Sequence, residues 1–238
     1  MKTEYNNFDY SKIQGIHEVA LRIDILKERL LHLSSGKQKK ILEVGVGAGD
    51  VTLMLARQFE DVTCVDSSDE NCRLVLQRLT DNDLRVVKFL QSRIEDAELA
   101  AAGYDHIVLL GVLEHLEDPV GALRHLEKYV CADGCIHIAV NLANSLHRWL
   151  GVDMGIISKI DELGESDIKL GHYRVYTLQL LRQHLKDAGL SITYERPFYL
   201  KPLPTSMMTS LPMEIHKGLF LLGERFPEFA SYIYMESM

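Results

Sequence analysis

The sequence predicts an α/β protein whose mostly parallel sheet carries helices on both faces. Short runs rich in Val, Ile and Leu alternate along the chain with helical segments, which is the pattern of strand–helix–strand units. The first run, residues 41–44, ends in a turn where Gly45, Gly47 and Gly49 alternate with small residues, directly before a predicted helix over residues 51–59. A strand, a tight glycine turn and a helix N-terminus in this order form a nucleotide-binding corner of an α/β sheet.

Length and composition fit one ordinary globular domain. The chain has 238 residues, of which 47% are hydrophobic and 25% are charged, so we expect a single domain over residues 1–238 with a substantial core. The net charge is −8 and no Lys/Arg-rich run is present, which argues against a nucleic-acid partner. No apolar stretch is long enough to span a bilayer, and residues 1–10 do not resemble a signal peptide. We therefore expect a cytoplasmic protein whose four cysteines are reduced.

Apolar residues recur at three- and four-residue spacing across residues 11–33, which predicts an amphipathic N-terminal helix. His17 and Glu18 lie near its apolar stripe. Two interpretations are open for this helix: it packs against the edge of the sheet, or it caps a bound cofactor.

The spacing of the glycine turn distinguishes two kinds of nucleotide site. The dinucleotide fingerprint is G-x-G-x-x-G, whereas this turn reads G-x-G-x-G, with Asp50 in the place of that third glycine and Glu43 two positions before the first. The stretch resembles the first motif of class I S-adenosylmethionine-dependent methyltransferases, E/D-x-G-x-G-x-G. The resemblance implies a Rossmann-like seven-stranded, mostly parallel sheet with an antiparallel last strand. It also implies that Glu43, Gly45, Gly47 and Gly49 bind the cofactor beside its methionine part.

The next predicted strand, residues 61–66, ends in an acid about 20 residues beyond the first glycine. A carboxylate there offers two oxygens to the two hydroxyls of a ribose. We expect Asp66, with Ser67 beside it, to bind the ribose of the cofactor. Alternatively, Asp66 caps the helix predicted over residues 70–79, although any of the three residues after it could do the same.

Residues 85–90 are predicted to form the third strand, and residues 91–96 follow it. This second segment resembles the adenine-edge motif of the same family. The resemblance implies that Ile94 packs on the adenine ring and that Glu95 lies near its amine. The alternative is a loop with a charged helix start.

A buried-strand run over residues 104–110 leads to a second specific motif. Residues 113–119 read Leu-Glu-His-Leu-Glu-Asp-Pro, which resembles a segment of the branch that contains quinone-pathway and natural-product or sugar methyltransferases. Ligands bind at the carboxyl ends of parallel strands, so we assign Leu110 and Gly111 to cofactor binding. Asp118 and Pro119 are predicted to begin the next helix.

Some quinone-pathway relatives bind a divalent metal through two glutamates and a histidine at this point. Glu114 and His115 are present, but Gly111 takes the place of the other glutamate. We therefore expect no required metal. His115 is then either a base near the transferred methyl group or a structural residue under the acceptor pocket.

The second half of the chain contains two predicted acceptor-side insertions. Residues 120–130 are predicted to be helical, residues 132–134 to turn, and residues 135–140 to form the fifth strand. The regular alternation then breaks over residues 142–172, which we interpret as an insertion. It ends in residues 171–177, Gly-His-Tyr-Arg-Val-Tyr-Thr, which resemble the G-H-x-R-x-Y/F-T segment of the same branch.

His172 stands where this insertion re-enters the core, which favours a gate or a base over a surface histidine. Thr177 is predicted to cap a helix that Gly189 ends.

The sixth strand is predicted over residues 190–195. Residues 197–226, rich in Pro, Met and Phe, form the second insertion, which lines a pocket, packs as ordinary core or makes a dimer contact. The last strand, over residues 229–235, is expected to lie antiparallel beside the fifth.

The expected chemistry is an in-line methyl transfer from S-adenosylmethionine to a small-molecule or glycan acceptor. The sulfonium is already activated, so positioning supplies most of the acceleration. A base is needed only where the acceptor loses a proton, and the candidates are His172, then His115, with Glu114 orienting. Three alternatives remain: another reaction with the same cofactor, a nicotinamide oxidoreductase, and a non-catalytic regulatory module.

Overall fold

A single seven-stranded sheet forms the centre of the molecule. The computed structural model describes residues 16–34, 39–99, 101 and 103–238. The strand order is β3-β2-β1-β4-β5-β7-β6. The strands are β1 Lys40–Val44, β2 Asp61–Asp66, β3 Val87–Gln91, β4 Tyr104–Leu110, β5 Val130–Asn141, β6 Ile192–Phe198 and β7 Tyr232–Ser237. β7 runs antiparallel between β5 and β6, and the other pairs are parallel. The predicted fold class is confirmed.

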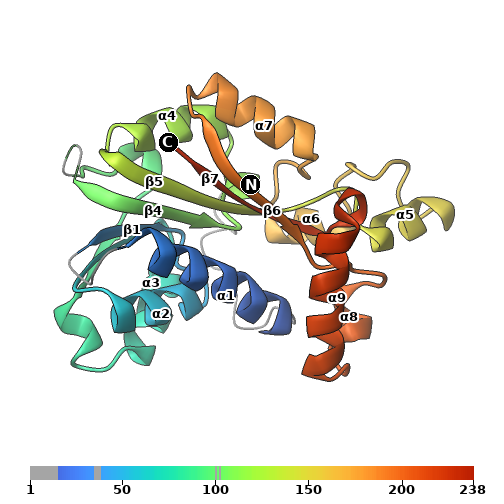
Figure 1. Cartoon of the computed structure of the whole chain (residues 1–238), viewed down its shortest axis with the longest axis horizontal. Helices are drawn as coiled ribbons and strands as arrows, with labels where there is room; N and C mark the ends of the chain where they lie inside the picture. The colour runs from blue at the N-terminus through green and yellow to red at the C-terminus, as the bar shows by residue number, and fades with distance from the viewer. Residues whose placement is uncertain (1–15, 35–38, 100, 102) are drawn as a thin grey trace.

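Helices cover both faces of this sheet (Figure 1). The α-helices are α1 Ile16–Leu33, α2 Asp50–Gln58, α3 Asp69–Arg78, α4 Pro119–Glu127, α5 Leu146–Asp153, α6 Glu165–Leu170, α7 Leu178–Asp187, α8 Thr205–Met208 and α9 Met213–Arg225. The short 3-10 helices are η3 Asp83–Arg85, η4 Ile94–Asp96, η5 Leu113–His115 and η6 Pro227–Phe229. Residues 11–15 of the predicted first helix lie outside the described residues.

Two apolar core layers lie on opposite faces of the sheet. Leu42 of β1 belongs to the layer under α4 and α7, whereas its neighbour Ile41 belongs to the layer under α1 and α2. Alternate side chains of a strand point to opposite faces, so one strand contributes to both layers. No helix in the described ranges combines the length and apolar character that crossing a membrane requires.

The glycine turn between β1 and α2 requires its glycines. Gly45, Gly47 and Gly49 have φ of 78°, 49° and 88°, a left-handed region that other residues rarely adopt. A Cβ at Gly45 would lie 2.7 Å from Val112 Cγ2, and one at Gly49 would lie 2.7 Å from Val75 Cγ2. The predicted strand, turn and helix N-terminus are confirmed.

Helix boundaries follow the predicted caps. Ser68, and not Asp66, caps α3 by accepting from Asn71 N at 3.2 Å. Asp118 accepts from Gly121 N at 2.9 Å, and Thr177 accepts from Leu180 N at 3.1 Å.

Some predicted boundaries are wrong. The turn expected at residues 132–134 lies inside β5, where residues 131–134 bulge opposite Asp105 while the pairing resumes at Cys135. β3 begins at Val87 because the residues before it form η3. β6 continues to Phe198, inside the second predicted insertion.

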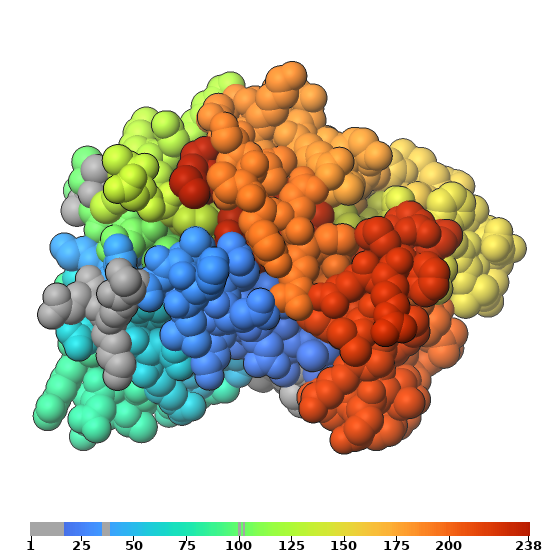
Figure 2. All heavy atoms as spheres, viewed as in Figure 1, coloured from blue at the N-terminus to red at the C-terminus, as the bar shows by residue number. Residues whose placement is uncertain are grey.

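Both insertions contain helices and lie at the same end of the molecule (Figure 1). The first holds α5 and α6, and the second holds α8 and α9. His147 N donates to Lys201 O at 3.0 Å, which joins one insertion to the other. α9 also packs against α1 (Figure 2). The second insertion therefore contacts both α1 and the first insertion, which follows the carboxyl end of β5.

Candidate active site

Glu43 lies buried beneath the glycine turn. Its Oε2 accepts from Thr52 Oγ1 at 2.7 Å and from Cys64 Sγ at 3.3 Å, which ties β1 to α2 and β2. Burial raises the pKa of Glu43 to about 8, against the opposite effect of these two hydrogen bonds. The carboxyl is thus mostly protonated at neutral pH, and it supports the turn from below.

Asp66 joins the end of β2 to the same turn. Its two oxygens accept from Val46 N and from Ser68 N, each at 2.8 Å. Each carboxylate oxygen has a second lone pair, so these bonds leave acceptor capacity for ribose hydroxyls. Ser67, the neighbour predicted with it, is exposed. The structure thus adds a positioning role for Asp66 to the predicted ribose contact, which stays a prediction.

The outer side of the glycine turn has free space at Gly47, and an arginine fixes the end of the turn. A Cβ at Gly47 would meet nothing within 4 Å. Arg78 of α3 donates to Ala48 O and to Asp50 Oδ1, the latter at 2.6 Å. The turn therefore has a fixed shape and free space above its centre.

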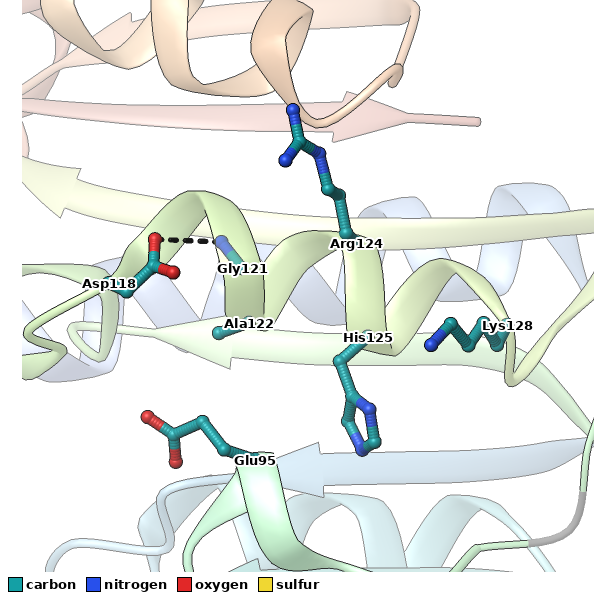
Figure 3. A pocket seen from close by; sticks show the side chains of 7 residues that line it. All are labelled: Glu95, Asp118, Gly121, Ala122, Arg124, His125 and Lys128. Carbon is teal, nitrogen blue, oxygen red and sulfur yellow. Dashed lines mark hydrogen bonds between the residues drawn. The ribbon is translucent and has the colours of Figure 1, made fainter.

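The two predicted adenine contacts lie in different surroundings. Ile94 is buried in the core layer under α4 and α7. Glu95 pairs with Arg93 at 3.2 Å and points into a surface groove beside α4 (Figure 3). The groove is lined by Glu95, Asp118, Gly121, Ala122, Arg124, His125 and Lys128. Among the predicted site residues only Glu95 lines it, and both adenine roles stay predictions.

Gly111 follows Leu110 at the end of β4 and lies between the guanidinium of Arg22 and the carboxylate of Glu114. Its φ is 73°, and a Cβ there would lie 3.1 Å from Arg22 Nη1 and 3.8 Å from Glu114 Oε1. Arg22 comes from α1, and no pattern in the sequence pointed to it.

Arg22 makes no hydrogen bond or ion pair with the described part of the chain. Its guanidinium lies over the ring of Tyr232, 5.0 Å from the centroid, and its buried Nε has no hydrogen-bond partner. Buried polar groups are normally hydrogen-bonded. A half-buried guanidinium without an anion is therefore suited to bind one from a ligand.

The two motif histidines lie together. The rings of His115 and His172 are 4.6 Å apart and nearly perpendicular. Tyr173 N donates to Glu114 O at 2.8 Å, and Arg174 Nη1 donates to Leu113 O at 2.9 Å. The structure thus brings residues 171–177 onto residues 113–119, two segments that sequence analysis identified separately.

Asp167 orients His172 and was missed by sequence analysis. Its Oδ1 lies 3.1 Å from His172 Nδ1, and its Oδ2 accepts from Arg148 Nη1 at 3.1 Å and from Gly164 N at 2.9 Å. Burial alone would raise the pKa of Asp167, but the hydrogen bonds from His172 and Gly164 and the charge of Arg148 lower it to about 2. A charged carboxylate accepts a hydrogen bond from a proton on Nδ1 and so favours the tautomer that carries the proton there. In that tautomer the Nε2 of His172 carries the free lone pair.

Glu114 is buried and His115 is half-buried beside the Asp167–His172 pair. Burial lowers the pKa of His115, and the charge of Glu114 offsets part of this effect. Glu114 is 4% exposed, and its Oε2 has no hydrogen-bond partner. Among residues 16–34, 39–99, 101 and 103–238, no group of three or more His, Cys, Asp or Glu could hold a metal ion.

Comparison with known sequences finds methyltransferases among the similar proteins. A methyltransferase-domain model matches residues 42–138. The chain is 30% identical over 115 residues to ubiquinone biosynthesis O-methyltransferase of Rickettsia typhi, covering 48% of this chain and 46% of that protein. It is 29% identical over 170 residues to an uncharacterized methyltransferase of Mycobacterium tuberculosis, covering 69% of this chain and 85% of that protein. The chain thus spans about half the length of the first of these relatives.

Comparison with solved structures shows the fold. Magnesium protoporphyrin IX methyltransferase of Synechocystis, solved with bound S-adenosylhomocysteine, has a TM-score of 0.62 at 16% identity, covering 94% of this chain and 83% of that one. The [4+2]-cyclase SpnF has the same TM-score at 14% identity, covering 90% and 78%. The sheet order and these structural matches show the fold of class I S-adenosylmethionine-dependent methyltransferases, and the methyltransferase-domain match covers the cofactor-side half of that fold, residues 42–138.

Proposed function

We propose that the protein transfers a methyl group from S-adenosylmethionine to a small-molecule acceptor. The observation that carries this proposal is that residues 171–177 contact residues 113–119, so that the Asp167–His172 pair and His115 lie together after the end of β4. Arg22 lies beside Gly111, at the end of the same strand β4, and makes no hydrogen bond or ion pair with the residues that the structure describes. A fold alone would not decide the reaction, since the cyclase SpnF shares it.

The residues around the turn fit the cofactor. The free space over Gly47, the acceptor capacity of Asp66 and the unpaired Arg22 complement a backbone approach, a ribose and the methionine carboxylate respectively. When bound, S-adenosylmethionine supplies a methyl group on a sulfonium that leaves as a neutral thioether. The protein therefore has to orient the acceptor and exclude water.

His172 is the proposed base on the acceptor side. Its side chain is 6% exposed and its Nδ1 is held by Asp167, so its Nε2 can take the proton of a hydroxyl acceptor as the new bond forms. His115 packs edge-on against its ring and fixes its position. The proposal thus gives His172 the catalytic role and makes His115 and Asp167 positioning residues.

Methyl-labelled S-adenosylmethionine tests this function. The protein is incubated with the label and fractionated extract of its source cells, and label is counted in the small-molecule, glycan, protein and RNA pools. We expect label in the small-molecule pool, and its loss in His172→Ala with cofactor affinity unchanged by calorimetry. We expect Arg22→Met to weaken cofactor binding instead, with Arg57→Met, an exposed arginine of α2, as its control.

Two outcomes contradict the proposal. Tight cofactor binding with no label in any pool points to another reaction or to a regulatory module. Label confined to protein or RNA would mean that the acceptor is a macromolecule. Label in the glycan pool would indicate a glycan acceptor instead of a small molecule. Gel filtration tests the expected homodimer.

A further inference from the structure

A second group of buried polar side chains lies beyond Arg22, where α1 meets the second insertion. Glu18, Lys201, His216 and Tyr232 are 6%, 9%, 3% and 5% exposed. They come from α1, the loop after β6, α9 and the start of β7. β7 begins at Tyr232, which pairs with Asn141, the last residue of β5. This group of side chains therefore lies at the carboxyl edge of the sheet.

Glu18 and Lys201 form a pair that is incomplete. Tyr232 donates to Glu18 Oε2 at 2.5 Å, so this oxygen is occupied. Glu18 Oε1 lies 3.5 Å from Lys201 Nζ, beyond the usual hydrogen-bond length, and has no hydrogen-bond partner among the described residues. Lys201 Nζ donates to Thr205 Oγ1, which uses one of its three protons.

Further atoms of the same group are also unpartnered. Tyr199 Oη lies 2.6 Å from His216 Nδ1, but the buried His216 Nε2 has no partner. The ring of His17, 4.5 Å from that of His216, has an unpartnered buried Nδ1. Buried groups left in this state cost free energy unless a water or a ligand satisfies them.

The surrounding charges select the kind of ligand group. An anion would lie against Glu18, and a cation would lie against Lys201, which has the like charge of Arg22 within electrostatic range. A neutral hydroxyl avoids both repulsions. With about 2.8 Å to each atom, a usual hydrogen-bond length, one hydroxyl oxygen can donate to Glu18 Oε1 and accept from Lys201 Nζ across their separation.

We propose that Glu18 and Lys201 form an acceptor subsite that binds a neutral hydroxyl group. This inference rests on the proposed function, and it narrows the acceptor to an uncharged, hydroxylated small molecule such as an alcohol, a phenol or a polyol. The subsite lies next to Arg22 through the shared contact with Tyr232. Lys201 also lies within electrostatic range of Asp167, the carboxylate that holds His172. The subsite is therefore placed to hold one end of an acceptor whose other end faces the histidines.

The test separates the small-molecule pool of the extract by ion exchange into acidic, basic and neutral fractions before the label assay. We expect label in the neutral fraction. Glu18→Gln and Lys201→Met are then assayed against dilutions of that fraction, with Glu28→Gln, an exposed position of the same helix paired with Arg196, as the matched control. We expect half-saturation to rise about tenfold in both variants, the effect of one lost buried hydrogen bond, with cofactor affinity unchanged.

A variant that leaves a lone buried charge is at risk of unfolding. The double variant Glu18→Gln/Lys201→Met removes both charges and is expected to fold while still showing the weakened half-saturation. Label only in the acidic or basic fraction would overturn the subsite while leaving methyl transfer intact. The subsite would also be overturned if Glu18→Gln and Lys201→Met showed the same half-saturation as the control Glu28→Gln. Absence of label from every fraction of the wild type would overturn the proposed function, and the subsite with it.

Discussion

Asp167 contributes to the site only through the side chain that it holds. It bonds the Nδ1 of His172, and a neutral amide in its place would lose the preference for a proton on that nitrogen. We predict that Asp167→Asn lowers methyl transfer by at least about tenfold, because the wrong tautomer removes the lone pair from Nε2. Nitrogen chemical shifts of His172 should report the change of tautomer directly.

The same variant separates positioning from a purely structural role. In a His172→Ala background, Asp167→Asn should cause no further loss, since residues that act as a unit are not additive. Asp161 is an acid of the same insertion that pairs with Lys159. The control Asp161→Asn should leave the rate of methyl transfer unchanged in both the wild-type and the His172→Ala backgrounds. An equal additional loss in the His172→Ala background would show that Asp167 serves the insertion and not the imidazole.

Which site residues the sequence could predict depends on how local their signal is. Glu43 and Asp66 were predicted because a motif of fixed spacing contains them. Arg22 and Asp167 were missed because their importance comes from what the fold brings beside them: Gly111 next to Arg22, and His172 with Arg148 around Asp167. A single arginine on a helix and a single acid in an insertion carry no pattern.

At the scale of elements, α9 depends on a close approach to the chain after β6. A Cβ at Gly223 would lie 2.1 Å from Tyr199 N and 2.5 Å from Phe198 C. Tyr199 itself has φ of 60°, the one positive value for a non-glycine residue in the described ranges. Backbone atoms cannot move aside as a flexible side chain can, so α9 packs here only because Gly223 has no side chain.

Gly223→Ala should therefore destabilise the protein by about 1–3 kcal/mol, the usual cost of overpacking. Gly218 of the same helix is the matched control, because a Cβ there meets nothing within 4 Å. Gly218→Ala should be neutral or stabilise by up to about 1 kcal/mol through helix propensity. Denaturant unfolding followed by circular dichroism measures both, and equal effects would contradict the packing argument.

Elements with a strong apolar signal were predicted well, and the others were not. β2 and β4 match their predicted bounds because both are short buried runs. α5 has only eight residues and none of them is buried, so its apolar residues at helical spacing are too few to identify a helix from the sequence. The glycine at position 134 indicated a turn between separate elements, whereas β5 absorbs it in a bulge.

At the scale of the whole molecule, two sets of buried groups give the stability opposite dependences on pH. A hydrogen-bonded chain crosses the sheet through His106, His137 and Tyr234, with distances of 3.0 Å and 2.5 Å. Burial lowers the pKa of His106 to about 4 and that of His137 well below its usual value. Glu43, with a pKa raised to about 8, behaves in the opposite way.

The signs follow from proton linkage. The histidines bind protons more readily when unfolded, so their contribution is complete above pH 6.5, their ordinary pKa, and is lost as pH falls towards 4. Glu43 binds its proton more readily when folded, so its contribution is complete below pH 4.5 and is lost as pH rises to about 8. The two slopes oppose each other between pH 4.5 and 6.5, and outside this window one slope acts alone.

We predict that the free energy of unfolding declines on both sides of this window. Glu43→Gln, which resembles the protonated carboxyl in shape, should remove the alkaline decline, so that stability rises from pH 4 to 6.5 and stays level to pH 8. Urea titrations at half-unit pH intervals measure both curves. An alkaline decline that persists in Glu43→Gln would assign it to another group, and the Glu43 carboxyl beneath the glycine turn would then be charged at neutral pH.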